Sequence, residues 1–351
     1  MSVDLLNFIE TVLNGLMSGV MYSLVALGFV LIFKASGVFN FAQGVFALFA
    51  ALTLVGYQTG QVPFAHLINE LFGTNYHNWY ASMPNFLAII LTMITMIALA
   101  WIIERLVLKH LVNQDPIILF MATIGLAFVL EGVGDLMWGS DVKVLDVGIP
   151  SGGSTWLEEA TIGLAAEGSD YYGMYIDVLN VWATVIAVIL VITLALFSQY
   201  TKTGRALRAV ADDHQAALSV GISLRTIWIL VWAISGFIAM VAGIMWGTES
   251  GVQFSLSLIA LKALPVLILG GFTSIPGAII GGLLIGVGEK LAEIYIPSPS
   301  SAGDLFELWT NDRWRSTPHR VVSPKLRDEA AVPSSEEAAR HSDGQGRWQR
   351  P

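Results

Sequence analysis

Long apolar stretches separated by short polar connections are the first pattern along this chain. Each stretch has roughly 20 residues, enough for a helix to cross about 30 Å of hydrocarbon at about 1.5 Å per residue. Because an unpaired backbone amide is costly in lipid, each crossing stretch is expected to be helical. The pattern predicts an all-α polytopic membrane protein with about eight membrane segments and some interrupted helices. The expected segments are 8–33, 38–58, 84–103, 116–138, 178–198, 227–247, 254–271 and 276–296.

Composition supports lipid as the solvent of this chain. Hydrophobic residues make up 55% of its 351 residues and charged residues 13%, whereas soluble domains carry about 25% charged residues. The chain has no cysteine, and its six histidines are scattered, so neither a disulfide nor a metal site is expected. A formal charge of −9 gives no indication of nucleic-acid binding.

The basic residues predict how the segments are oriented. Short loops rich in Lys and Arg stay in the cytoplasm. The connections that hold such residues alternate along the chain with connections that hold almost none, at 59–83 and 139–177. We therefore expect the acidic 139–177 loop and the N-terminus to lie outside the cell. The residues expected inside are Lys34, Arg105, Lys109, Lys202, Arg205, Arg208 and Arg225.

The connection at 199–226 is cytoplasmic by this rule, polar, and rich in helix-forming residues. Gly204 is expected to start a turn, the Ala-rich stretch that follows favours helix, and Gly221 suits a helix C-terminus. One interpretation is a solvated connector that carries ordinary positive-inside residues. The other is a docking element for a cytoplasmic partner. Composition alone leaves both open.

Small or polar residues interrupt the apolar segments around Asn40 and Gln43, and again at Gly270 and Gly271. Interruptions free backbone groups that protein or water must satisfy, and paired ones point to a translocation path. The two amides are expected to line that path, because they are costly beside apolar residues unless they meet partners or solute. At Gly270 and Gly271 a tight turn is an equal alternative. A role in helix packing is expected for the glycines Gly281, Gly282, Gly286 and Gly288.

Charged side chains within the apolar segments raise the same choice between transport and packing. Glu131 and Asp135 lie one helical turn apart, and an acidic group costs about 2.5–3.5 kcal/mol near the bilayer centre. Asp135 is expected at the interface, whereas Glu131 is deeper and is a candidate for the translocation path. Lys262 is a further candidate, with an interhelical ion pair or a snorkelling side chain as alternatives. The same alternatives apply to Glu289, Lys290 and Glu293.

No catalytic motif occurs in the sequence. The chain lacks a Gly-x-x-x-x-Gly-Lys-Ser/Thr loop for ATP, a His-Glu-x-x-His motif and a Gly-x-Ser-x-Gly elbow. We expect no catalytic residue, no metal and no cofactor. If ATP drives transport, another subunit must hydrolyse it.

Three ordered motifs carry a family resemblance. They are Asn-Phe-Ala-Gln-Gly at 40–44, Gly-Arg-Ala at 204–206 with Gly-Ile at 221–222, and Gly-Gly at 270–271 with Pro-Gly at 276–277. Over about residues 5–296 the chain resembles the permeases of branched-chain amino acid importers, ABC-type systems whose relatives also carry urea and short amides.

The resemblance implies a machine in the bacterial inner membrane. Its other parts would be a second related permease, cytoplasmic ABC ATPases and an external solute-binding protein, with membrane lipid around it and no nucleic acid. The 199–226 connection would then be the coupling loop that docks on an ATPase. The implied coupling residues are Gly204, Arg205, Arg208, Ala211, Asp212, Gly221 and Ile222.

The character of the chain changes after Ile296. Residues 297–351 are rich in Ser, Pro and charge and contain no membrane-length apolar run, so a disordered tail is expected. Because the resembling family continues with a further membrane helix, we interpret the tail as a frameshift or truncation.

Two competing functions remain at this point. An ion-coupled secondary transporter would use Glu131 and Lys262. A membrane enzyme or receptor would need a catalytic or ligand constellation that the sequence does not display.

Overall fold

The computed structural model describes residues 3–37, 39–61, 69, 71–73, 83–111, 114–150, 152–162, 173–212 and 214–295. Within them the chain is helical, with only two isolated β-bridges, so the all-α prediction is confirmed. The helices belong to one compact unit, 1–296. They are α1 (Val3–Ser36), α2 (Gln43–Thr59), α4 (Asn85–Leu106), η1 (Leu108–His110), α5 (Pro116–Trp138), α6 (Thr155–Ile162), α7 (Val178–Tyr200), α8 (Lys202–Asp212), α9 (His214–Ser219), α10 (Leu224–Ser250), η2 (Phe254–Leu258), α11 (Ile259–Gly270) and α12 (Ile275–Tyr295).

The predicted membrane segments correspond to helices of the structure. Six helices of the described residues are long and apolar enough to cross a bilayer, namely α1, α4, α5, α7, α10 and α12. The other two expected segments are shorter helices: α2, which begins at Gln43, and the η2–α11 pair. Boundaries agree within a few residues, except that α1 begins at Val3 and so extends outward beyond the predicted segment.

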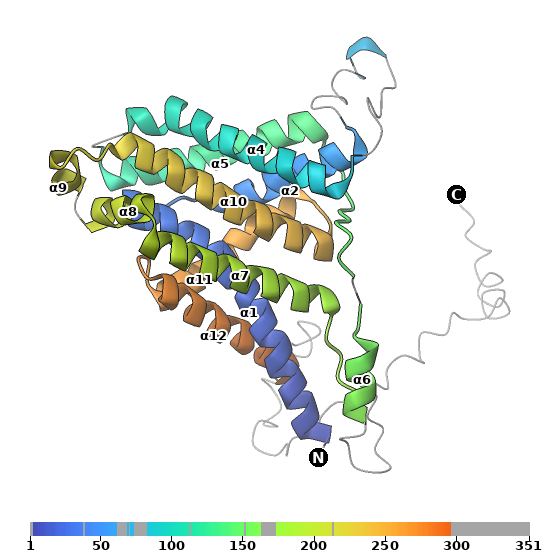
Figure 1. Cartoon of the computed structure of the whole chain (residues 1–351). Coiled ribbons are helices and arrows are strands. Elements are labelled where there is room, and N and C mark those ends of the chain that lie inside the picture. Colours follow the sequence, from blue (N-terminus) through green and yellow to red (C-terminus); the bar gives the residue numbers. More distant parts are fainter. Residues whose placement is uncertain are drawn as a thin grey trace, which may run out of the picture. The chain divides into compact units, whose positions relative to one another are not determined.

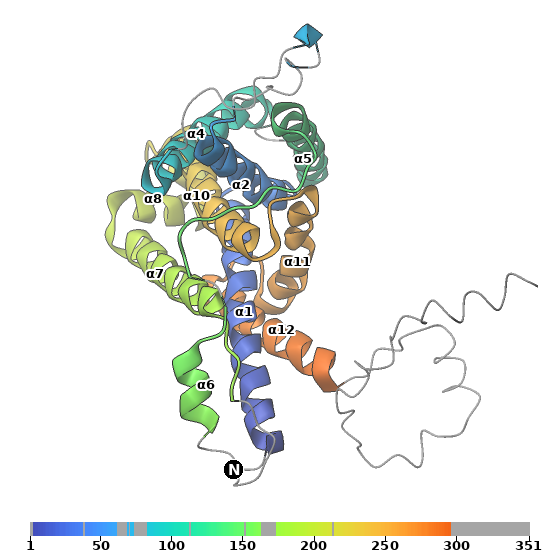
Figure 2. The same cartoon turned by 90° about the vertical axis from the view of Figure 1, so that its right-hand side faces the viewer.

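The longest helix, α1, forms the centre of the bundle. It packs against α12 over most of its length and also contacts α7, α10 and α11 (Figures 1 and 2). Its inner half is almost completely buried, as are α2 and the middle of α10. The remaining long helices leave apolar side chains exposed on their outer faces, as expected where lipid surrounds a protein.

Glycines let α1 and α12 approach closely. A Cβ on Gly286 would clash with the backbone of Gly15 and Gly19, and one on Gly282 would meet the Ser23 hydroxyl. That hydroxyl donates across the contact to the Ile279 carbonyl at 3.2 Å. The packing role predicted for these glycines is therefore confirmed, as it is for Gly281, whose Cβ would clash with the Val266 carbonyl of α11. For Gly288 the prediction was wrong, because no atom of the described residues lies within 4 Å of its Cβ position.

The two ends of the bundle carry different elements. α8 and α9 lie at one end, whereas α6 and the start of α1 lie at the opposite end (Figure 1). The predicted inner and outer connections are thus separated in space, while their assignment to cytoplasm and exterior stays a prediction.

The 139–177 loop is held against the bundle by Lys143 and Val252, which exchange backbone hydrogen bonds of 2.9 and 2.8 Å. Burial lowers the pKa of the Lys143 ammonium, and the charge of Asp141 partly offsets this.

Residues 297–351 form a separate unit outside the described residues. The predicted disorder of this tail and its interpretation as a frameshift or truncation both lie there and stay predictions.

Candidate functional site

Asn40 and Gln43 lie inside the protein and have protein partners. Both side chains are buried, and the Gln43 Oε1 accepts from the Ser235 hydroxyl at 2.7 Å while its Nε2 donates to the Ser235 carbonyl at 3.3 Å. The Ser235 hydroxyl also lies 3.1 Å from the carbonyl oxygen of Gly28. A side chain at Gly28 would overlap the side-chain amide of Gln43, so the glycine leaves room for this contact. This buried cluster joins the start of α2 to α1 and α10. These contacts explain why the Asn40 and Gln43 side chains can be buried in the bundle. A role for the two residues in a solute path stays a prediction.

The backbone of the non-helical stretch before α2 has two side-chain partners, Thr123 of α5 and Asn40 within the stretch, whose Oδ1 accepts from the Ala42 amide at 3.1 Å. The Thr123 hydroxyl donates to the Phe39 carbonyl at 3.0 Å and accepts from the Phe41 amide at 3.2 Å. Backbone that leaves the helical pattern at membrane depth needs such partners. Sequence reasoning missed Thr123 and Ser235, and the only signal for them was a small polar residue within each apolar segment.

We expect Gln43→Leu to lower the free energy of unfolding by about 1–3 kcal/mol, because it leaves the buried groups of Ser235 without their side-chain partner. The measurement is unfolding in mixed micelles titrated with SDS. Thr53→Val is the matched control, since the buried Thr53 hydroxyl donates only to the Phe49 carbonyl of its own helix, at 2.7 Å. Equal losses in the two variants would contradict the special role of the cluster.

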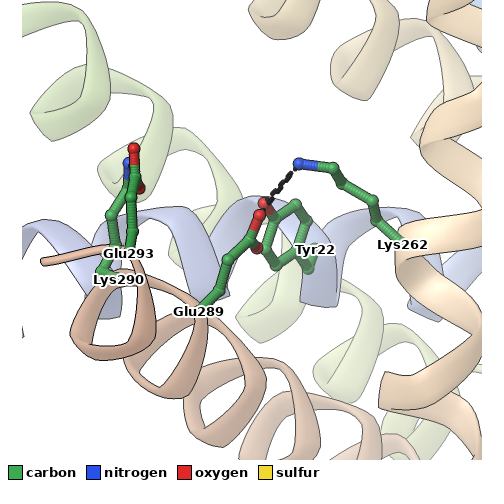
Figure 3. A network of polar contacts seen from close by, with 5 residues as sticks. All are labelled: Tyr22, Lys262, Glu289, Lys290 and Glu293. Carbon is green, nitrogen blue, oxygen red and sulfur yellow. Dashed lines mark hydrogen bonds and ion pairs between the residues drawn. The ribbon is translucent and has the colours of Figure 1, made fainter. Parts of the chain in front are cut away.

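Lys262 lies in a polar network between three helices (Figure 3). Its Nζ is 3.0 Å from the Glu289 carboxylate of α12 and 3.2 Å from the Tyr22 hydroxyl of α1. The ammonium also lies 5.5 Å from the centre of the Tyr22 ring and 6.0 Å from that of Trp246, and these two rings stack with centroids 5.7 Å apart. We call these four residues the lysine network. Lys290, the next residue of α12, forms a second ion pair with Glu293 at 2.8 Å.

The alternative of an interhelical ion pair is therefore observed for Lys262. Glu131 lies half-buried on α5, and neither ion pair recorded among the described residues includes it. Asp135 is exposed close to the end of α5. The structure does not bring Glu131 and Lys262 together as a pair.

At Gly270 and Gly271 the structure has the tight turn that was the alternative to a path. Gly271 has a positive φ of 88°, and Gly270 packs directly on Gly277 of the next helix. Ser274 caps α12, since its hydroxyl accepts from the Gly277 amide at 3.0 Å. The turn joins α11 to α12, and a role for these two glycines in transport stays a prediction.

A polar pocket of about 320 Å³ opens at the end of the bundle where α1 begins. It is lined by α1, α7, α10 and α12 and by the segment that precedes α7. Its charged residues are Glu10, Asp177, Glu249, Lys290 and Glu293, and the uncharged polar ones include Asn14, Ser18 and Asn180. Such a volume and mixed polarity suit a small polar solute.

At the opposite end, α8 packs one face on the bundle and exposes the other. Leu207 and Val210 are buried, and Gly204 fits against the backbone of Phe197 and Ser198 at the end of α7. Gly204 thus lies within α8 and permits close packing, so the predicted turn at Gly204 was wrong. Arg205 is exposed.

Arg208 turns back toward its own chain. One guanidinium nitrogen lies 3.4 Å from the Gln199 carbonyl, and the buried Nε has no partner among the described residues. Of the two arginines expected to couple to a partner, only Arg205 is freely presented. Ala211 is half-buried and Asp212 is exposed at the end of α8.

The second part of the connection is a separate short helix, α9, which ends at Ser219 and is followed by the predicted helix-terminating glycine, Gly221. Gly221 has φ of 87°, its amide donates to the Leu218 carbonyl at 3.0 Å, and the Ile222 amide donates to the Ala217 carbonyl at 3.0 Å. This is a Schellman C-cap. It leaves Leu218 and Val220 pointing outward with 53% and 81% of their surfaces exposed, an apolar pair that sequence reasoning missed.

A bundle of membrane-length apolar helices with a polar pocket at one end and an exposed helical connection at the other defines a multi-pass membrane transport protein. The chain belongs to the family of the permease component of the branched-chain amino acid transport system, whose model matches residues 11–310.

Relatives in the same family include permeases from bacteria and an archaeon. The high-affinity branched-chain amino acid transport system permease protein LivH of Salmonella typhimurium is 29% identical over 308 residues, covering 84% of this chain and 89% of LivH. The permease protein BraD of Pseudomonas aeruginosa is 27% identical, covering 82% and 86%. A probable branched-chain amino acid permease of Methanocaldococcus jannaschii is 31% identical, covering 80% of each chain. No solved structure matches the chain.

Proposed function

We propose that this chain forms the translocation path for branched-chain amino acids in an ABC importer and that separate subunits hydrolyse the ATP. The observation that carries the proposal is the family match across residues 11–310, together with curated permeases of branched-chain amino acid systems aligned over more than four fifths of the chain. The partners in this proposal are a second related permease, cytoplasmic ABC ATPases and an external solute-binding protein. The location is the inner membrane of a bacterium.

The α8–α9 connection supports docking of an ATPase at this end of the bundle. It combines an exposed arginine, a residue type enriched at protein interfaces, with two exposed apolar side chains, Leu218 and Val220, whose burial by a partner would be favourable. α8 in turn contacts α1, α7 and α10. A displacement of α8 by ATP-driven closure of the ATPases would therefore be passed to three membrane helices by direct packing, which is a rigid-body route to alternating access.

An ion-coupled secondary transporter is the second candidate function, and the structure offers it little support. That candidate required Glu131 and Lys262 to act together, whereas Lys262 pairs with Glu289. A further alternative is that the chain is a permease for urea or short amides. It has the same mechanism and differs from the proposal only in the solute.

We expect Arg205→Glu to lower ATP-driven uptake of labelled leucine about tenfold while the amount of permease in the membrane stays unchanged, because it reverses a charge presented to the ATPase. The measurement uses proteoliposomes that contain both permeases and the ATPases, with the solute-binding protein added outside. Lys109→Glu is the control, since Lys109 is an exposed cation expected on the same membrane side but outside α8. Uptake by the wild-type protein that persists without ATPases and collapses with the ion gradient would overturn the proposal.

A further inference from the structure

The Lys262–Glu289 ion pair is exposed at a depth where lipid would be a poor neighbour. The side chains are 52% and 41% exposed, and Tyr22, Lys262 and Glu289 all fall within the predicted membrane segments, with Trp246 one helical turn before the end of α10. A charge facing hydrocarbon costs about 2.5–3.5 kcal/mol at the bilayer centre and less toward the interface. The Lys262 ammonium lies against the Tyr22 hydroxyl and two ring faces. The pair therefore requires water, solute or protein in front of it.

The polar pocket ends at the lysine network. Ser18, the innermost pocket residue of α1, is one helical turn before Tyr22. On α10, Glu249 of the pocket lies three residues after Trp246, and on α12, Lys290 directly follows Glu289. Three different helices thus place the pocket on the outer side of the network. Pocket residues lie one to four residues away from the network residues along each of these helices, so a solute in the pocket would lie close to the network.

The chemistry of the network matches the head group of an amino acid. Lys262 can receive a carboxylate, and Glu289 can receive an ammonium. The ring faces of Tyr22 and Trp246, now occupied by the Lys262 ammonium, suit a cation. The indole N–H of Trp246 is buried and has no hydrogen-bond partner among the described residues, so it is a spare donor on the same ring. A bound zwitterion adds one charge of each sign and leaves the net charge of the site unchanged.

We propose that the Lys262–Glu289 pair, flanked by Tyr22 and Trp246, opens to hold the carboxylate and ammonium of a zwitterionic amino acid on its way through the membrane. This inference rests on the proposed function and names the place where the solute's polar end is recognised. Two alternative roles for the pair are a purely structural tie between α11 and α12 and a contact covered by the second permease, and the experiments below distinguish them from recognition.

The absence of cysteine from the sequence permits a direct test. We expect Glu289→Cys in the assembled complex to react with a charged methanethiosulfonate at least about tenfold faster than Ile189→Cys, because a thiolate forms only in water. Ile189 is a matched control, being 58% exposed on the apolar face of the membrane-spanning α7. Protection by ligand is measured at Ser18→Cys instead, because this variant keeps both Lys262 and Glu289 and places the thiol in the pocket one helical turn before Tyr22. Millimolar leucine is expected to slow the labelling of this cysteine about threefold, and 4-methylpentanoate, which lacks the ammonium, to slow it less.

A charge swap separates recognition from a structural tie. The double variant Lys262→Glu with Glu289→Lys keeps an ion pair between α11 and α12 but places a carboxylate against the two ring faces. We expect its leucine uptake to fall at least about tenfold while its thermal stability and its co-purification with the ATPases stay near wild type. Wild-type uptake by the swapped protein would establish a structural tie and overturn the inference.

The labelling result stands on its own if the swapped protein does not fold. Slow labelling of Glu289→Cys in the complex, equal to that of Ile189→Cys, would show a covered or lipid-facing pair and also overturn the inference. Failure of the proposed function is a different outcome, because it appears as a wild-type complex without ATP-driven uptake.

Discussion

Replacing Leu218 and Val220 with aspartate is expected to abolish ATP-driven uptake, with the permease still present in the membrane at its normal level. The two side chains expose 53% and 81% of their surfaces on α9 and the turn that follows it. Exposed apolar side chains in a polar connection are costly unless a partner covers them. Full burial of a Leu or Val side chain against an ATPase would contribute about 1.5–3 kcal/mol each. Two new carboxylates would remove that contribution and add unpaired charges to the interface.

The measurement is the amount of ATPase that co-purifies with the variant, followed by uptake in proteoliposomes. Val144→Asp is the control, because Val144 is 84% exposed and lies in the loop at the opposite end of the bundle. The control is expected to retain its ATPases and its uptake. If the double variant binds the ATPases as strongly as the wild type, α9 is not the docking element.

Gly286→Val is expected to prevent α1 and α12 from packing and to destabilise the protein by about 3 kcal/mol or more, at the upper end of overpacking costs. A side chain at this position would overlap backbone atoms of Gly15 and Gly19, which cannot rotate away as a side chain can. The variant is therefore expected to be degraded or to aggregate in detergent.

Gly288→Val makes the same substitution two residues further along the helix, where no atom of the part of the chain that the structure describes lies within 4 Å of the Cβ position. Its unfolding free energy is expected to change by no more than about 0.5 kcal/mol. Size-exclusion chromatography and thermal melts of the two variants provide the comparison. Similar melts for both would show that the close approach of α1 and α12 is unimportant for stability.

The fold could be predicted from the sequence because lipid imposes a simple rule on long apolar stretches. All eight expected segments are helices, and 116–138 agrees at both ends. The beginning of α2 was harder, because the stretch from Phe39 to Ala42 depends in part on hydrogen bonds to Thr123, far away in the sequence, besides the local bond from the Ala42 amide to the Asn40 side chain. Hydropathy contains no information about such pairing.

The individual site residues could be predicted only in part. Gly221 was identified as a helix end because the local conformation required there is a property of glycine itself. Gly204 was misjudged because its role depends on the neighbouring backbone of α7. Lys262 was identified as unusual from its surroundings in the sequence, but its partners Tyr22 and Trp246 lie on two other helices and follow only from the fold.

The length of α1 has a mechanical consequence. A helix of 34 residues measures about 51 Å at 1.5 Å per residue, whereas the hydrocarbon layer is about 30 Å thick. Roughly 20 Å of the rod must therefore stand clear of the bilayer or be taken up by tilt. Because its N-terminal turns border the pocket and the same helix contacts α8 at the other end of the bundle, a change in the tilt of α1 would move both ends of the bundle together.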